Sequence, residues 1–322
     1  MNRKILMIFV VFLAVAMLTT PLVAASPLIA SVQAVTVDIN GTLGGADYLM
    51  RIPSNWNGEL IVFCRPFSIL EPTPAYLASQ ADNYAVLVTM GYAFALSTFG
   101  AGGYCIKEGI IRTHQMTEYL IDNYDITGKV YLIGISLGGN IALLLGAKYP
   151  ELYDGVLDIA GSKDLIGAYN DKMYYAGLND ADLTQAIQDN GGVLPPYPIP
   201  NLFVFRLFSL GTGTDIFLAC GGNTPVEKPK AYERISPTFS AVDISVPTIT
   251  VHGTADSLVP YSSSIAFMNA VTVAGHSDMY RLYKVDGGKH GDPALMTPAM
   301  QIHFPQLVAW VENGNPAPPS VT

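Results

Sequence analysis

Ser136 lies at the centre of a glycine-rich motif, Gly-Ile-Ser-Leu-Gly-Gly, which spans residues 134–139. An apolar run over residues 130–133 precedes the motif, and a segment suited to a helix, residues 141–148, follows it. A serine on a tight turn between a strand and a helix projects its hydroxyl, and small neighbours let the two elements approach closely. The first N–H groups of the helix would stabilise negative charge that develops beside the serine. The motif therefore predicts a nucleophilic Ser136, with the N–H of Leu137 as one oxyanion donor.

A nucleophilic serine needs a general base, and the base needs a carboxylate that fixes its tautomer. Two later loops supply such groups, each directly after an apolar run that suits a strand. The first loop, residues 252–260, carries Asp256, and the second, residues 286–292, carries His290. Catalytic groups of an open α/β sheet gather at the carboxyl ends of its strands, in the chain order serine, acid, histidine. We therefore predict Asp256 as the orienting acid and His290 as the base.

The other candidates for these two roles fit less well. Four histidines stand in expected helices, at the end of a strand or before the last strand: His114, His252, His276 and His303. Of these, His252 is expected to pack beneath the 252–260 loop. Three aspartates compete with Asp256: Asp158, Asp286 and Asp292. The first lies inside an expected strand, and the other two flank His290 too closely in sequence to reach around its ring.

Strands and helices alternate around these loops. Apolar or alternating runs indicate strands within residues 34–64 and over 92–97, 130–133, 155–159, 248–251 and 280–285. Helices are expected over 108–123, 141–148 and 301–312. Apolar strands that alternate with helices predict an α/β fold with a mostly parallel central sheet and helices on both faces. We assign this core to residues 35–161 and 241–312.

The alternation breaks over residues 162–240, which we interpret as a cap inserted over the site. This segment carries a proline-rich run at 195–200 and three phenylalanines, Phe203, Phe205 and Phe208. An apolar cap would bury an acyl or aryl group, so the three phenylalanines are candidate substrate contacts. A second packing layer without a role in binding is the alternative. The polar, proline-containing tail, residues 313–322, is expected to be flexible.

The N-terminus resembles an export signal. Arg3 and Lys4 precede an apolar run over residues 5–18, and Val-Ala-Ala at 23–25 offers small residues for cleavage after Ala25. Residues 1–25 are thus expected to be a signal peptide of a secreted protein, and an uncleaved membrane anchor that leaves the folded part outside the cytosol is the alternative. The net charge of −9, with no cluster of Lys and Arg, argues against a nucleic-acid partner.

Three cysteines, Cys64, Cys105 and Cys220, are too few and too scattered for a disulfide framework or a cysteine-based zinc site. Cys64 ends an apolar run and is expected to be a buried free thiol. Whether Cys105 and Cys220 pair stays open at the level of the sequence.

The three loops together resemble those of the α/β-hydrolase superfamily, and the resemblance extends over about residues 35–312. It rests on Gly134 to Gly139, on His-Gly-Thr-Ala-Asp with Leu-Val-Pro at 252–260, and on Gly-Lys-His-Gly at 288–291. The segment 53–67 is also similar to secreted hydrolases in which an apolar strand runs into a His-Gly oxyanion loop. This chain has Arg65-Pro66-Phe67 there instead. Because proline has no N–H, the second oxyanion donor is expected to be the N–H of Phe67.

The resemblance implies a secreted serine hydrolase that cleaves carboxylic esters through an acyl-enzyme and needs neither a metal nor an organic cofactor. An apolar cap favours a small-molecule ester of the feruloyl, aryl or general carboxylesterase kind. A serine exopeptidase of the prolyl type is the first alternative, because an acidic surface would suit a cationic substrate terminus. A binding protein that keeps the fold without activity is the second alternative.

Overall fold

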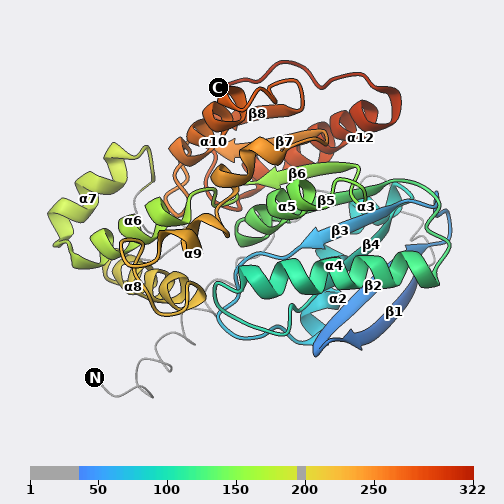
Figure 1. Cartoon of the computed structure of the whole chain (residues 1–322), viewed down its shortest axis with the longest axis horizontal. Helices are drawn as coiled ribbons and strands as arrows, with labels where there is room; N and C mark the ends of the chain where they lie inside the picture. The colour runs from blue at the N-terminus through green and yellow to red at the C-terminus, as the bar shows by residue number, and fades with distance from the viewer. Residues whose placement is uncertain (1–35, 194–200) are drawn as a thin grey trace.

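The computed structural model describes residues 36–193 and 201–322. The signal peptide expected over residues 1–25 and the proline-rich run at 195–200 lie outside the described residues. In the described part, one eight-stranded sheet runs through the molecule in the order β1-β2-β4-β3-β5-β6-β7-β8 (Figure 1). Its strands are β1 (Thr36–Leu43), β2 (Ala46–Pro53), β3 (Leu60–Cys64), β4 (Ala93–Ser97), β5 (Val130–Ile135), β6 (Gly155–Ile159), β7 (Thr248–Gly253) and β8 (Tyr280–Val285).

The strands from β3 to β8 pair in parallel, whereas β1 and β2 form an antiparallel hairpin that joins the sheet through an antiparallel pairing of β2 with β4. Parallel strands need crossover connections, which here are helices and long loops. Every residue of β3, β4, β5, β6 and β7 is buried, as expected of strands covered on both faces. The predicted mostly parallel sheet is confirmed.

Helices cover both faces of the sheet. Alternate strand residues point to opposite faces, so Val62 packs in one apolar cluster and its neighbour Phe63 in another. The first cluster includes residues of α4 (Ile106–Asn123), α5 (Leu137–Lys148) and α10 (Ser262–Val273). The second includes residues of α2 (Pro74–Asn83), α3 (Ala85–Thr89), α11 (Pro293–Pro298) and α12 (Phe304–Asn313), the last two joined by a π-helical turn, η2 (Ala299–His303).

The segment between β6 and β7 is helical and lies at the end of the sheet toward which the parallel strands point (Figure 1). It contains α6 (Leu165–Gly177), α7 (Asp180–Asp189), α8 (Leu202–Ala219), α9 (Pro229–Glu233) and η1 (Pro237–Asp243). Asp164, Asn179 and Asn201 cap the first three helices by accepting a hydrogen bond from a backbone N–H. We call residues 162–240 the cap.

Helix α8 is long and apolar enough to span a membrane by length and composition alone. In the structure it packs along α6 in the cap. A Cβ placed on Gly213 would lie 2.8 Å from the sulfur of Met173, which shows how closely the two helices approach each other.

The C-terminal tail differs from the flexible segment predicted for residues 313–322. Its Val321 pairs in parallel with Tyr283 of β8, and the backbone of Val321 exchanges hydrogen bonds with Leu282 and Lys284. The Tyr283 hydroxyl also donates to the Pro318 carbonyl. The reason is that β8 is an edge strand, and its unpaired backbone groups need partners.

All three cysteines are free and buried, so the pairing of Cys105 with Cys220 that the sequence left open is not present. Cys64 ends the buried strand β3, as expected for a structural thiol. Burial raises the pKa of the Cys64 thiol, which keeps it protonated.

Candidate active site

Ser136 occupies the turn between β5 and α5 with a positive φ of 57°. Few residues other than glycine adopt this backbone conformation, so the turn is strained. The Ser136 N–H donates to the carbonyl of Ile159, 2.9 Å away at the end of the neighbouring strand β6. The backbone is therefore held from the side of β6 while the hydroxyl projects from the turn.

Three glycines around Ser136 allow this turn to form. A Cβ on Gly134 would lie 2.1 Å from the carbonyl oxygen of Gly138, and a Cβ on Gly138 would lie 1.9 Å from that of Cys64. A Cβ on Gly139 would lie 2.2 Å from the Asp158 carboxylate. No side chain fits at these distances. The glycines of the motif thus let α5 begin directly against β3, β5 and β6.

The structure brings Ser136, Asp256 and His290 together. His290 Nε2 lies 3.0 Å from Ser136 Oγ, and His290 Nδ1 lies 2.6 Å from Asp256 Oδ2. The three residues follow β5, β7 and β8, at the carboxyl ends of parallel strands. In this arrangement the imidazole can accept the hydroxyl proton on one nitrogen while the carboxylate holds the N–H on the other.

Asp256 is fully buried, and its second oxygen is also occupied. Asp256 Oδ1 accepts hydrogen bonds from the N–H groups of Leu258, at 2.8 Å, and Val259, at 2.9 Å. Burial alone would raise the pKa of this carboxyl, but the charge of His290 and the hydrogen bonds from His252 and His290 outweigh it. The net effect holds the pKa of Asp256 well below its usual range, so the group is a carboxylate at neutral pH.

The carbonyls of the same two loop residues are bonded to partners on opposite sides. The Val259 carbonyl lies 2.9 Å from His252 Nε2, and the Leu258 carbonyl accepts from Lys172 Nζ at 2.8 Å. His252 Nδ1 lies 2.6 Å from the hydroxyl of Ser264, which completes its bonding. His252 thus packs beneath the loop, as the sequence predicted. Lys172 was not among the predicted residues, because its partner is a backbone carbonyl 86 positions away in the sequence.

The candidate oxyanion donors come from the start of α5 and from the loop that follows β3. The N–H of Leu137 is the first of α5, and the first N–H groups of a helix have no partner within it. Phe67 follows β3, whose last carbonyls pass close to Gly138. Arg65, which precedes this loop, is fully buried, and its guanidinium donates to the carbonyls of Pro66, Thr98 and Ala101. Arg65 therefore fixes the loop that carries Phe67.

The three phenylalanines predicted as substrate contacts have different surroundings. Phe205 is fully buried in the cap, where its ring lies 6.0 Å from that of Tyr175. Phe203 is 59% exposed. Phe208 is half-buried, and its ring lies 6.4 Å from the ring of Phe67. Successive residues of α8 point in different directions, so of the three only Phe208 has a contact with a predicted site residue.

The three aspartates that competed with Asp256 for the role of the acid lie in ion pairs or cap a helix. Asp158 lies in β6 and forms a buried ion pair with Lys163, with 2.7 Å between Oδ2 and Nζ. Its Oδ1 also accepts from the Gly161 N–H. Asp292 caps α11 by accepting from the N–H of Leu295. Asp286 lies near Lys284, at 3.6 Å. Within residues 36–193 and 201–322, no group of three or more His, Cys, Asp or Glu side chains is placed to hold a metal ion.

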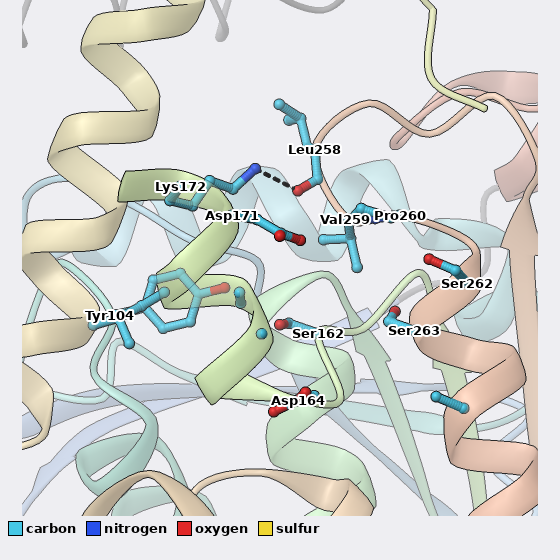
Figure 2. Close-up of a pocket in the computed structure, with 14 residues that line it drawn as sticks. Tyr104, Ser162, Asp164, Asp171, Lys172, Leu258, Val259, Pro260, Ser262 and Ser263 are labelled. Carbon is cyan, nitrogen blue, oxygen red and sulfur yellow. Dashed lines mark hydrogen bonds between the residues drawn. The ribbon is translucent and has the colours of Figure 1, made fainter. Parts of the chain in front are cut away.

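A cavity of about 320 Å³ lies between the cap and the loop that follows Asp256 (Figure 2). Its lining includes Tyr104, Ser162, Asp171, Lys172, Leu258 and Ser263. Neither Ser136 nor His290 is part of this lining, so the cavity adjoins the acid side of the site. Its walls mix apolar and charged groups.

The strand order and the turn at Ser136 define an α/β-hydrolase fold, and the hydrogen-bonded Ser136, His290 and Asp256 form a candidate site for nucleophilic catalysis. Two family models agree with this. The model of the Prolyl oligopeptidase family (Peptidase_S9) matches residues 203–313, and that of the Esterase family matches residues 111–192. The chain has the α/β-hydrolase fold that the sequence motifs predicted, and parts of it match two families of hydrolases.

A curated relative, the o-phthalyl amidase of Xanthobacter agilis, is 23% identical over 179 residues, which are 48% of this chain and 37% of the amidase. The chain therefore spans well under half of that relative's length. A solved brefeldin A esterase, a bacterial homologue of human hormone sensitive lipase, superposes with a TM-score of 0.59 at 13% identity and covers 94% of this chain and 85% of its own. The acylaminoacyl peptidase of Pyrococcus horikoshii gives a TM-score of 0.57 at 13% identity, over 86% of this chain and 41% of its own. These structures share the fold.

Proposed function

We propose that this chain hydrolyses small-molecule carboxylic esters through an acyl-enzyme formed on Ser136. The observation that carries the proposal is the continuous hydrogen-bonded series from Ser136 Oγ through the His290 ring to Asp256, at 3.0 and 2.6 Å. Ser136 at one end of this series and His290 in its middle are half-buried, and Asp256 at the other end is fully buried. A buried carboxylate, an imidazole and a strained serine in this order match the needs of nucleophilic catalysis.

In the first half of the reaction, Ser136 Oγ attacks the ester carbonyl carbon while its proton passes to His290 Nε2. Asp256 stabilises the resulting imidazolium through the bond to Nδ1. The carbonyl electron pair moves to oxygen, which the N–H groups of Leu137 and Phe67 stabilise. When the tetrahedral intermediate collapses, the bond to the alcohol breaks and the alcohol takes the proton from His290. The acyl group is then bonded to Ser136.

In the second half, water attacks the acyl carbon and gives its proton to His290. The second tetrahedral intermediate collapses, Ser136 Oγ regains the proton, and the carboxylic acid leaves. The cap helix α8 supports a substrate with an apolar acyl or aryl group, because it brings Phe208 to the side of the site formed by Phe67.

Hydrolysis of an amide or peptide bond is the second candidate function. The match of residues 203–313 to the Prolyl oligopeptidase family favours it, because this segment includes Asp256 and His290. The same acyl-enzyme chemistry would serve, with an amine as the leaving group that takes the proton from His290.

The test compares the protein lacking residues 1–25 with its Ser136→Ala variant. A fluorophosphonate should label the first and spare the second, and turnover of a chromogenic ester should fall by about 10⁴-fold or more. Retention of a tenth of the activity would refute Ser136 as the nucleophile. A panel of p-nitrophenyl acetate, hydroxycinnamate esters and aminoacyl anilides then separates the esterase from the peptidase. An unlabelled, inactive protein would instead support a binding role.

We also propose that the protein is exported. The basic start, apolar run and small residues within positions 1–25 support this. Expression of the full chain followed by N-terminal sequencing of the exported protein tests it. A new N-terminus near Ser26 would support cleavage, an intact start in the membrane fraction would support an anchor, and an intact soluble protein in the cytosol would refute export.

A further inference from the structure

We propose that Lys172, on the cap helix α6, is a positioning residue that holds the Asp256 loop and thereby couples the cap to proton transfer at His290. The inference rests on the proposed function. Lys172 donates to the Leu258 carbonyl and lies over the rings of Tyr175 and Phe205. Its effect would be transmitted by Leu258, which is hydrogen-bonded both to Lys172 of the cap and to Asp256.

The hydrogen bonds of Leu258 connect the two sides. Its N–H donates to Asp256 Oδ1 at 2.8 Å, and its carbonyl accepts from Lys172 Nζ at 2.8 Å (Figure 2). The Leu258 carbonyl and the Val259 N–H belong to one planar peptide group, so a rotation that breaks the bond to Lys172 would also turn the Val259 N–H away from Asp256 Oδ1, which it meets at 2.9 Å. Because Asp256 Oδ2 is the partner of His290, a turned carboxylate would lose the 2.6 Å bond to Nδ1.

The loop is therefore held from both sides. On the side of the core, His252 is hydrogen-bonded to the carbonyl of Val259 and to the hydroxyl of Ser264. On the side of the cap, Lys172 takes the carbonyl of Leu258. The N–H groups of Leu258 and Val259 donate to Asp256. The carbonyl of Leu258 is bonded to Lys172, and that of Val259 to His252. Removal of Lys172 would remove the 2.8 Å hydrogen bond that the Leu258 carbonyl accepts.

A lysine at position 172 would destabilise the fold relative to an apolar residue if packing were its only role. The residue is 5% exposed, and its ammonium lies 5.8 Å from the ring centroids of Tyr175 and Phe205. A buried ammonium is destabilising unless it is bonded, and a methionine would fill the same apolar space without that cost. The bond to Leu258 and the nearby carboxylates of Asp171 and Asp256 offset the cost.

The surroundings of Lys172 also give it a titration that can be measured. Burial lowers the pKa of Lys172 to about 8, against the opposing charges of Asp256 and Asp171. Tyr175 on the same helix is the other titratable group that faces it, while α8 presents Phe205 and Gly213. The ammonium therefore loses its charge as pH rises through about 8, and its bond to the Leu258 carbonyl weakens.

The experiment compares Lys172→Met, Lys172→Arg and the control Tyr175→Phe. The control removes a cap hydroxyl on the same helix, which accepts a hydrogen bond from Asn190 Nδ2. We expect Lys172→Met to lower kcat for a chromogenic ester by about 10- to 100-fold with KM changed less than about twofold. Tyr175→Phe should keep both constants near those of the wild type.

The pH profile separates positioning from mere stability. The wild-type kcat should decline above about pH 8. Lys172→Arg keeps its charge at all these pH values, so its kcat should not show this decline. If Lys172→Met folds poorly, the comparison of the wild type with Lys172→Arg still tests the proposal. An equal alkaline decline in both proteins would overturn the proposal.

Two further outcomes would also overturn it. A kcat of Lys172→Met within twofold of the wild type would remove the positioning role, and a raised KM at unchanged kcat would mean that Lys172 contacts substrate. A readout without turnover is the low-field proton resonance between His290 Nδ1 and Asp256, which should shift or broaden in Lys172→Met and stay unchanged in Tyr175→Phe. Failure of the proposed function itself would show separately, as activity that survives Ser136→Ala.

Discussion

The ring of Phe208 meets the ring of Phe67 edge-on, with centroids 6.4 Å apart and 81° between the ring planes. Phe208 belongs to the cap helix α8, and Phe67 carries one of the proposed oxyanion N–H groups. The contact between Lys172 and Leu258 joins the cap to the acid side of the site. The cap therefore contacts both sides of the site, at the proposed oxyanion donor and at the acid.

Phe208→Ala should impair bulky aryl esters and spare acetate. Burial of an aromatic ring contributes on the order of 2 kcal/mol, which is about thirtyfold in affinity. We expect kcat/KM for a hydroxycinnamate ester to fall by roughly that factor, with the acetate value within about twofold. Phe203→Ala is the matched control, because its exposed ring should affect neither ester. An equal loss on both esters in Phe208→Ala would mean that the cap packs without binding the substrate.

Much of the core could be predicted because its strands are apolar runs. Apolar strands that alternate with helices are expected to form a parallel sheet covered on both faces. Ser136, Asp256 and His290 each follow such a strand, so the sheet brings them together from positions up to 154 apart in the sequence. Helix α10 begins with three serines and follows no clear apolar period, and it was not predicted. Lys172 could not be found, since its partner is a backbone carbonyl that any residue could provide.

The tail shows a second limit of sequence patterns. Residues 313–322 have the proline and polar content of a flexible segment, yet Val321 and Ser320 bond to the backbone of β8. Backbone pairing needs no periodic side chains, so it leaves little trace in composition. The sequence also does not indicate which of the three phenylalanines in the cap points inward, for a different reason. Their spacing fits neither a helix face nor a strand face, and only the packing of α8 on α6 decides which one is buried.

Asp256→Asn should lower kcat by several orders of magnitude because an amide cannot hold the imidazole in the tautomer that accepts the serine proton. The same change at Asp292 should cost less than about tenfold, since Asp292 caps α11 and an asparagine caps a helix equally well. Steady-state kinetics on one ester compare the two variants. A larger loss for Asp292→Asn would move the acid to the other loop.

Gly138→Ala should prevent the site from forming. The added methyl would lie 1.9 Å from the Cys64 carbonyl, so β3 and α5 would have to separate. We expect a clear loss of thermal stability and no fluorophosphonate labelling. Gly211→Ala on α8 is the control, because nothing lies within 4 Å of its added methyl and alanine favours a helix by about 1 kcal/mol over glycine. Its melting temperature should match or exceed that of the wild type, and a labelled, stable Gly138→Ala protein would contradict the proposed packing.

Asp215→Asn should stabilise the protein at neutral pH. Burial raises the pKa of Asp215 on α8 from 3.8 to about 6, so the folded state holds this proton more tightly than the unfolded state does. Stability is then fully present below pH 4 and falls as pH rises from about 4 to 6, because the unfolded state releases the proton first. The asparagine is never charged, so its melting temperature should exceed that of the wild type at pH 7 and approach it at pH 4. Asp122→Asn, at an exposed position of α4, is the control for removal of a carboxylate at the surface. An Asp215→Asn effect that is the same at both pH values would mean that the carboxyl is well solvated in the folded protein.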